Sequence, residues 1–226
     1  MADIKSKVSS SYIKEQLDKY GTLTYRLAYK RSYLVVGARI NDPINIGGHI
    51  ARALPFGNIQ TVDKTVGDVT NVEFLDELFR EEYGGYDTLI CCQGTTHLEW
   101  IENQTPSDIS RQLHDSLMSH MLLTNKFVNA TIDAPWRKCI IYVGSMAYRQ
   151  VLNGSSIYCA AKAGLNMFAR CMAWELAPKG YDVYIIHPGN VACSPMAEQT
   201  IAELQRYRHM DEAAAREYWN TGNPRD

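Results

Sequence analysis

The stretch SYLVVGARINDPINIGGHIARAL, residues 32–54, begins with a short apolar run and continues through a glycine turn into a segment whose pattern is typical of a helix. An apolar run without polar alternation predicts a strand that is buried on both faces. The same order recurs along the chain, with further strands predicted from NIQTVD, YDTLICCQG, KCIIYVGS and YDVYIIHPGNV. Strands that alternate with helices predict an α/β fold, in which a doubly wound parallel sheet lies between helices in three layers, α/β/α.

The length of the chain favours a single domain, and its net charge argues against a nucleic-acid or membrane partner. The chain of 226 residues has a formal net charge of −2, which gives no attraction to nucleic acid or to an anionic membrane surface. We expect an N-terminal extension over residues 1–31, with a helix near residues 10–19, and a single domain over residues 32–226 that includes a helical lid from about residue 195. No segment approaches the roughly 20 apolar residues of a membrane span.

The cysteine spacing and the start of the chain bear on the cellular compartment. The six cysteines lie mostly within apolar or helical runs, away from the spacing of disulfide frameworks or zinc sites, so we expect reduced thiols and no metal. The start MADIKSKVSSSYIKEQ has no apolar stretch long enough for a signal peptide. These patterns predict a cytoplasmic location.

The turn after the first strand is a candidate phosphate site. Gly37 follows the strand, and Asn45, Ile46 and Gly47 stand at the start of the next predicted helix. Glycines let the backbone approach a pyrophosphate at a helix N-terminus, where free N–H groups and the helix dipole favour anions. The spacing is longer than in the usual G-x-G-x-x-G pattern and Asn45 replaces a middle glycine, so a plain tight turn explains these residues equally well.

The residues after the second strand bear on the choice of dinucleotide. Asp63 lies at the distance beyond Gly37 where an acid binds the hydroxyls of an adenosine ribose, which favours NAD. Arg39 and Lys64 flank the same region and could pair with a 2′-phosphate, so NADP stays an alternative.

The stretch SSIYCAAKAGL, residues 155–165, places Tyr158 and Lys162 about one helical turn apart on the same face. A cation beside a phenol favours the phenolate, and the tyrosine then exchanges protons more readily near neutral pH. Ser145, which ends the preceding strand, would offer a hydroxyl to the same substrate oxygen and stabilise charge that develops there. Taken alone, the Tyr–Lys spacing is more typical of a buried aromatic residue beside a lysine.

Ser145, Tyr158 thirteen residues later, Lys162 and the following HPGNV together resemble the pattern of the short-chain dehydrogenase/reductase family, over about residues 32–196. The resemblance implies a Rossmann fold and an NAD(P)-dependent oxidoreductase that interconverts a secondary alcohol and a ketone, with a small-molecule carbonyl or alcohol as substrate. It also implies that Tyr158 transfers the proton, that Ser145 polarises the oxygen, and that Lys162 holds the nicotinamide ribose and lowers the pKa of the tyrosine. The long helices predicted at residues 105–130 and 156–176 commonly pair across subunits in this family, which favours a homodimer or homotetramer.

The remaining site residues follow from their positions in the same motifs. Ser116 stands where the family has an active-site asparagine that supports a water-linked proton relay. Ser145, Met146 and, from its place just after the Gly94 turn, His97 are expected to face the substrate. The expected cofactor contacts are Gly37, Arg39, Asn45, Ile46, Gly47, Asp63, Asp68, Val69, Cys92, Gln93, Gly94, Tyr158, Lys162, Pro188, Gly189, Val191 and Ser194.

Departures from the family pattern keep a second hypothesis open. CCQG, residues 91–94, stands where the family usually has Asn-Asn-Ala-Gly, Ser116 replaces the asparagine, and the last strand of the family has no counterpart after residue 196. The alternative is a nucleotide-binding but catalytically weak regulatory or assembly subunit of the same fold, and a third possibility is that no dinucleotide binds. A missing last strand would leave a sheet edge for a partner to cover, unless the chain is incomplete.

Overall fold

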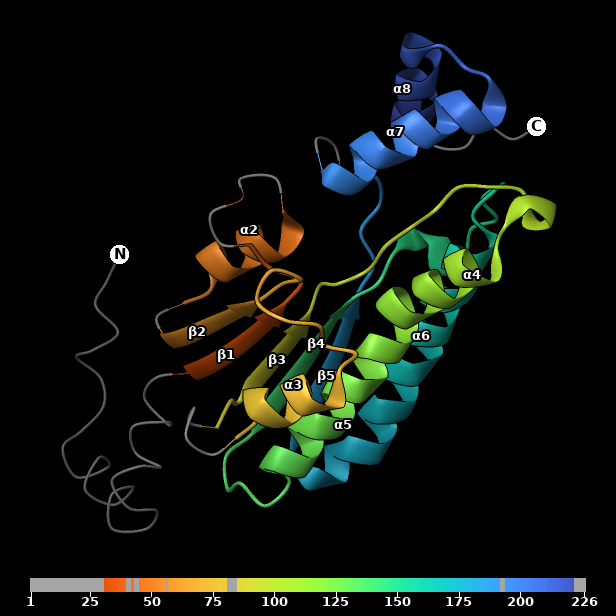
Figure 1. Ribbon diagram of the computed structural model, residues 1–226. Helices are drawn as coiled ribbons and strands as arrows, with labels where there is room; N and C mark the ends of the chain where they lie inside the picture. The colour runs from red at the N-terminus through yellow and green to blue at the C-terminus, as the bar shows by residue number, and fades with distance from the viewer. Residues whose placement is uncertain are drawn as a thin grey trace.

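A parallel sheet forms the centre of the molecule (Figure 1). The computed structural model describes residues 31–39, 42, 45–55, 57–80, 85–191 and 194–221, so the helix expected near residues 10–19 lies outside the described residues. The strand order is β2-β1-β3-β4-β5, and each neighbouring pair runs parallel. The strands are β1 Arg31–Val36, β2 Gly57–Val62, β3 Thr88–Cys91, β4 Lys138–Val143 and β5 Tyr181–Ile186.

Helices cover both faces of this sheet, as the sequence predicts. The helices are α2 Ile46–Ala53, α3 Val72–Leu78, α4 Pro106–Leu113, α5 Ser119–Thr131, α6 Ser156–Leu176, α7 Pro195–Arg208 and α8 Glu212–Thr221. Single turns of 3₁₀ helix lie at Ile101–Asn103, Met146–Tyr148 and Ala177–Lys179. The predicted doubly wound α/β/α fold is confirmed.

The first strand shows how one apolar run supplies two cores. Leu34 and Val36 pack into the cluster formed with α3, α5 and α6, whereas Tyr33 and Val35 pack into the cluster formed with α2. Successive side chains of a strand point to opposite faces, so a strand between two helical layers must be apolar at consecutive positions. All four side chains are buried, which explains why this stretch lacks polar alternation.

The long helix expected around residues 105–130 is interrupted. Thr105 begins α4 with a reciprocal capping box to Asp108, but a π turn, His114–Met118, separates α4 from α5. A π turn inserts a residue into the helix and rotates the following face, and such turns are frequent at functional sites. Ser116 lies in the middle of this turn and is fully buried.

The sheet ends at β5 within the described residues, and the residues that follow form α7 and α8 rather than a further strand. Two apolar side chains of this edge strand are open to solvent, with Tyr184 56% and Ile186 46% exposed. The helices α7 and α8 lie beyond the carboxyl ends of the strands, where the chain from β5 leads directly into them (Figure 1). None of the helices in the described part of the chain combines the length and the apolar character that a membrane crossing needs.

Candidate functional site

A cavity of about 1430 Å³ opens at the carboxyl ends of all five strands. Parallel α/β sheets commonly bind ligands at this edge, because the loops that follow the strands converge there. The residues that follow β1 to β5 and line the cavity include Gly37, Arg39, Asp63, Asp68, Val69, Cys92, Gln93, Gly94, Ser145, Met146, Pro188, Gly189 and Val191. Ser194 at the start of α7 also lines it, together with Tyr158 and Lys162 from α6.

Ser145 takes its position from the end of β4. Its side chain begins the short helical turn Met146–Tyr148, with the hydroxyl accepting a hydrogen bond from the Ala147 N–H at 3.2 Å. The same hydroxyl shares a hydrogen bond with the phenol of Tyr158. The backbone carbonyl of Ser145 lies 3.2 Å from Nδ1 of His187. The hydroxyl is therefore held beside the tyrosine by contacts on both sides of the turn.

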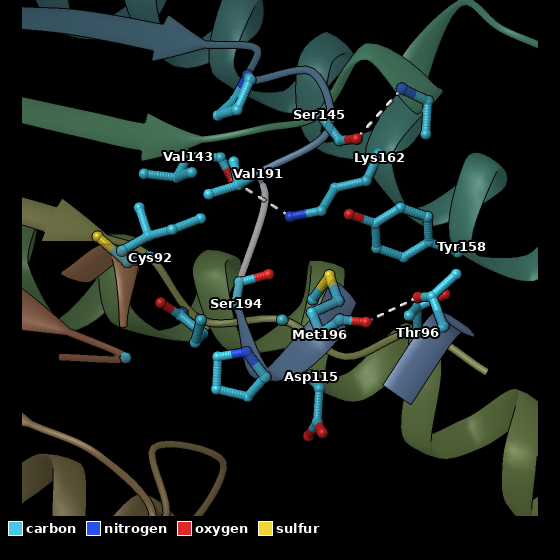
Figure 2. Close-up of a pocket in the computed structure, with 18 of the residues that line it drawn as sticks. Cys92, Thr96, Asp115, Val143, Ser145, Tyr158, Lys162, Val191, Ser194 and Met196 are labelled. Atoms are coloured by element: carbon cyan, nitrogen blue, oxygen red, sulfur yellow. Dashed lines mark hydrogen bonds between the residues drawn. The ribbon is translucent and has the colours of Figure 1, made fainter. Parts of the chain in front are cut away.

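Tyr158 and Lys162 lie one turn apart near the start of α6 and point into the same part of the cavity (Figure 2). Only 9% of Tyr158 and 3% of Lys162 are exposed. The ammonium of Lys162 donates a hydrogen bond to the Val143 carbonyl at 3.1 Å and lies 5.8 Å from the centre of the tyrosine ring. Ser145, Tyr158 and Lys162, predicted from three separate sequence positions, thus meet at one point.

The electrostatics of this trio differ from the expectation in one respect. Burial raises the pKa of Tyr158, and the hydrogen bond from Ser145 is the contact that opposes this rise. Lys162 is expected to lower this pKa, but the pKa of Lys162 lies below that of the phenol, so its amine is already neutral at the pH where Tyr158 ionises. Burial lowers the pKa of Lys162 itself to about 8, with the nearby thiols of Cys92 and Cys91 acting in the opposite direction.

The start of α2 provides a surface for an anion. Asn45 caps this helix by accepting a hydrogen bond from the Gly48 N–H at 2.7 Å, and it also accepts one from the Arg39 N–H at 3.1 Å. A Cβ on Gly47 would lie 2.6 Å from the Gly37 carbonyl oxygen, so the helix can approach the preceding turn only with glycine there. The first turn of α2 contains no acidic residue. The helix N-terminus at the cavity therefore fits a pyrophosphate.

The segment after the neighbouring strand β2 carries the acids expected to bind the adenosine. Burial raises the pKa of Asp63, but hydrogen bonds from Thr65 and Arg39 outweigh it and hold this pKa below its ordinary value. Hydrogen bonds from Thr70, at 2.9 Å from its N–H and 2.7 Å from its hydroxyl, lower the pKa of Asp68. Both carboxylates therefore stay ionised at neutral pH.

Two glycines, Gly94 and Gly189, leave room at the centre of the cavity. A Cβ on Gly189 would meet no atom within 4 Å, so the backbone there faces open space. A Cβ on Gly94 would lie 3.4 Å from the Lys162 ammonium and 3.5 Å from the Ser116 hydroxyl. A flat ligand can approach the backbone at both positions, and together with the α2 N-terminus and the two acids these residues fit a dinucleotide.

Comparison with known proteins agrees with this geometry. A sequence profile described as short chain dehydrogenase matches residues 28–205. The chain belongs to the short-chain dehydrogenase family.

Relatives within the family are distant. The chain is 30% identical over 113 residues to benzil reductase ((S)-benzoin forming) of Bacillus cereus, covering 49% of this chain and 45% of that protein. It is 29% identical over 171 residues to the 3-oxoacyl-[acyl-carrier-protein] reductase of Bos taurus, covering 75% and 70%. The chain thus spans about half the length of several curated relatives that it matches.

Solved structures share the fold of this short-chain dehydrogenase. A short chain dehydrogenase from Mycobacterium smegmatis superposes with a TM-score of 0.59 at 20% identity, covering 81% of this chain and 89% of that one. The aldohexose dehydrogenase of Thermoplasma acidophilum superposes with a TM-score of 0.64 at 16% identity, covering 83% and 76%.

Two expected site residues of this short-chain dehydrogenase do not line the cavity. His97 turns toward α7, where its Nδ1 lies 3.2 Å from a carboxylate oxygen of Glu203. The hydroxyl of Ser116 donates to the Thr95 carbonyl at 2.8 Å and accepts from the Thr95 N–H at 3.1 Å. Ser116 therefore ties the π turn to the loop after β3, and its part in a proton relay stays a prediction.

Most of the residues that α7 and α8 contribute to the cavity are absent from the sequence prediction. Met196, Thr200 and Leu204 line the cavity from one face of α7, and Trp219 lines it from α8. The three α7 residues are spaced four apart, a helical stripe that could have been recognised in the sequence. Leu98 also lines the cavity and packs with Leu204 in a cluster that closes this end.

The loop after β3 holds α7 in place through polar contacts. Glu203 accepts a hydrogen bond from the Leu98 N–H at 2.9 Å, and Gln199 donates one to the Thr96 carbonyl at 2.9 Å. Arg206 pairs with Glu99 at 2.7 Å. The wall that α7 provides is therefore fixed to the same loop that carries Gly94.

The thiols of Cys91 and Cys92 lie near the cavity. Burial raises the pKa of Cys92 to about 12 and also raises that of Cys91, so both stay protonated and contribute as small neutral groups.

Among the described residues, no three His, Cys, Asp or Glu side chains gather in a way that would hold a metal ion.

Proposed function

We propose that this chain binds NAD and interconverts a secondary alcohol and a ketone by hydride transfer. The observation that carries the proposal is the meeting of Ser145, Tyr158 and Lys162 in a cavity whose other end fits a dinucleotide. Bound NAD supplies the chemistry of accepting a hydride from the alcohol carbon, and NADH that of donating one to the carbonyl carbon.

Tyr158 is the proposed proton carrier. Because burial raises its pKa, the phenol is protonated at neutral pH and can donate to the oxygen of a ketone as that oxygen gains negative charge. The hydroxyl of Ser145 would donate a hydrogen bond to the same oxygen and stabilise its charge in the transition state. The contact between the two hydroxyls keeps them aimed at one point before substrate arrives.

Lys162 is the proposed anchor of the nicotinamide ribose. Its ammonium is buried and donates to the Val143 carbonyl, and an ammonium has three N–H groups, so further donors are left for ribose hydroxyls. The cation also makes the surrounding potential more positive, which favours the oxyanion that forms during proton transfer.

NAD rather than NADP is supported by the charges at the adenosine end. Asp63 would accept hydrogen bonds from free ribose hydroxyls and repel a 2′-phosphate. Arg39 and Lys64, the cations that could bind such a phosphate, are already paired with Asp63 and Asp115. The names of the relatives also support carbonyl chemistry, since the matched proteins of Bacillus cereus and Bos taurus are both reductases.

Location and assembly belong to the same proposal. The described cysteines Cys91, Cys92, Cys139, Cys159 and Cys171 are free thiols, which supports a reducing compartment such as the cytoplasm. We propose a homodimer or homotetramer, as the long helices α5 and α6 suggest by resemblance to the family.

The test combines binding with turnover. NADH and NADPH are titrated by fluorescence, and oxidation of each is then followed with a panel of ketones. Tyr158→Phe is expected to keep NADH affinity and to lose about 10²- to 10⁴-fold in kcat/KM. Binding without turnover in the unmodified chain, unchanged by Tyr158→Phe, would support the catalytically weak regulatory or assembly subunit instead. No binding of either dinucleotide would overturn both proposals.

A further inference from the structure

Charge is divided unevenly along the cavity. The Asp, Glu, Lys, Arg and His residues among the described lining residues, other than Lys162, come from the segments after β1 and β2 and from the π turn: Arg39, Asp42, Asp63, Lys64, Asp68 and Asp115. Asp, Glu, Lys, Arg and His are absent from the described lining residues of the loops after β4 and β5, and from those of α7 and α8. The end expected to hold the substrate is therefore uncharged apart from Lys162.

The arginines of α7 and α8 do not change this picture, because each is in contact with another side chain. Arg206 pairs with Glu99. Arg216 pairs with Glu198 at 2.9 Å and with Glu212 at 2.9 Å. Arg208 stacks over the ring of Tyr218, 4.7 Å from its centre. None of these three arginines lines the cavity.

The same end carries apolar side chains from four segments. Leu98 follows β3, Met146 and Leu152 follow β4, and Met196 and Leu204 come from α7. Leu98 and Leu204 are almost completely buried, at 6% and 2% exposed, and pack against each other. The polar groups at this end are amides and hydroxyls, including those of Asn153, Asn190 and Thr200. Such groups can form hydrogen bonds with an uncharged substrate.

Resting on the proposed function, we propose that the substrate is an uncharged ketone with an apolar substituent, and that carboxylate- or phosphate-bearing ketones are rejected. An anion that leaves water needs a cation or several donors to replace its hydration. Lys162, the one cation among the described lining residues at this end, is 3% exposed and already donates to the Val143 carbonyl. An apolar substituent would instead displace water from the partly exposed side chains of Met146, Leu152 and Met196.

The test compares ketones in matched pairs that differ in charge: methyl 4-acetylbenzoate with 4-acetylbenzoate, ethyl levulinate with levulinate, and ethyl benzoylformate with benzoylformate. In each reduction the carbonyl carbon gains a hydride from NADH, the oxygen gains a proton from Tyr158, and NADH is oxidised to NAD⁺. We expect kcat/KM to be at least about 100-fold higher for the ester in every pair that is turned over.

A charge-introducing variant tests the cause. Met196 lies on the first turn of α7 and is partly exposed, so lysine is tolerated there without a cavity in the core. Met196→Lys is expected to raise kcat/KM for the carboxylates at least about 10-fold and to lower it for the esters. Met196→Leu, which keeps the apolar surface, is expected to preserve the preference of the unmodified chain.

The outcomes separate this inference from the proposed function. Equal or faster reduction of the carboxylate members overturns the substrate class and leaves the oxidoreductase proposal intact. A Met196→Lys variant that is folded but shows no gain on any carboxylate overturns the role of charge. If NADH is oxidised with neither member of any pair nor with the wider ketone panel, the proposed function itself fails.

Discussion

Arg39 and Asp63 form an ion pair that joins the turns after two neighbouring strands, β1 and β2, at the end of the cavity expected to hold the adenosine. The arginine that could bind a 2′-phosphate is therefore held by the acid that we propose selects NAD. Asp63→Ser should release Arg39 and remove the repulsion toward a 2′-phosphate. We expect kcat/KM with NADPH, relative to NADH, to rise at least about 10-fold.

Steady-state kinetics with both cofactors check this prediction. The double variant Asp63→Ser with Arg39→Ala is the control, because it should lose most of the gain if Arg39 supplies the phosphate contact. An unchanged cofactor ratio in Asp63→Ser would show that this pair does not select the cofactor.

We expect Lys162 to be required for activity and to lower the free energy of unfolding. Its pKa falls from an ordinary 10.5 to about 8 on folding, so the unfolded chain binds more protons between pH 8 and 10.5 and stability rises with pH over that window. Below pH 8 the buried ammonium costs about 3 kcal/mol. Lys162→Met should therefore abolish turnover, increase the free energy of unfolding at pH 7, and remove the rise in stability above pH 8.

Urea unfolding at several pH values measures this effect, with Lys138→Met as a matched control. Lys138 is also buried, with its pKa lowered chiefly by burial, but it donates to the Ala134 carbonyl far from the cavity. Lys138→Met should keep activity. If Lys162→Met were less stable than the unmodified chain at pH 7, the cost assigned to the buried ammonium would be wrong.

His120 should limit stability in mild acid. It is fully buried beside Tyr142, and burial holds its pKa well below 6.5. The unfolded histidine gains a proton near pH 6.5 while the folded one stays neutral, so stability falls as the pH drops below about 6.5, by up to about 1.4 kcal/mol per pH unit. His120→Gln should flatten this dependence.

Thermal or urea unfolding between pH 5 and 8 provides the measurement. His49→Gln, at an exposed position on α2, is the control and should keep the slope. A slope that persists in His120→Gln would assign the acid sensitivity to another group, of which His187, whose pKa burial also lowers, is the first to examine.

Glu203 should affect substrate and cofactor differently. Its carboxylate accepts a hydrogen bond from the Leu98 N–H and faces His97, so Glu203→Ala removes the main polar contact between α7 and the loop after β3. We expect the KM for ketone to rise about 10-fold, in line with the loss of a hydrogen bond to a charged group. The dissociation constant of NADH should change little.

Glu198→Ala is the matched control on the same helix. Glu198 pairs with Arg216 at the surface and does not touch the loop after β3. A Glu203→Ala variant with unchanged KM for ketone, or with NADH affinity reduced to the same extent, would contradict the role of α7 as a wall of the substrate end.

The fold and the centre of the site were predictable because they follow from local patterns. Apolar runs identified the strands, and the carboxyl end of each strand then located Ser145, Gly94 and Pro188 at one edge. The four-residue spacing of Tyr158 and Lys162 predicted that both side chains lie on the same face of a helix.

Other features depend on contacts that periodicity does not encode. The π turn around Ser116 has no local signal in the sequence, because the same residues are compatible with a regular helix. His97 faces Glu203 rather than the cavity, a contact between residues 106 positions apart that only the docking of α7 creates. The direction of the ammonium of Lys162 depends on a carbonyl at the end of β4.

Ionic strength should act on the two ends of the cavity unequally. Lys64 reaches across to Asp115 at 2.8 Å, and 78% of its side chain is exposed, so dissolved ions can screen this contact. Ser145, Tyr158 and Lys162 lie at the sheltered end, where counterions have little access. Added salt would therefore weaken the tie between the segment after β2 and the π turn, while leaving the preference among ketones nearly untouched.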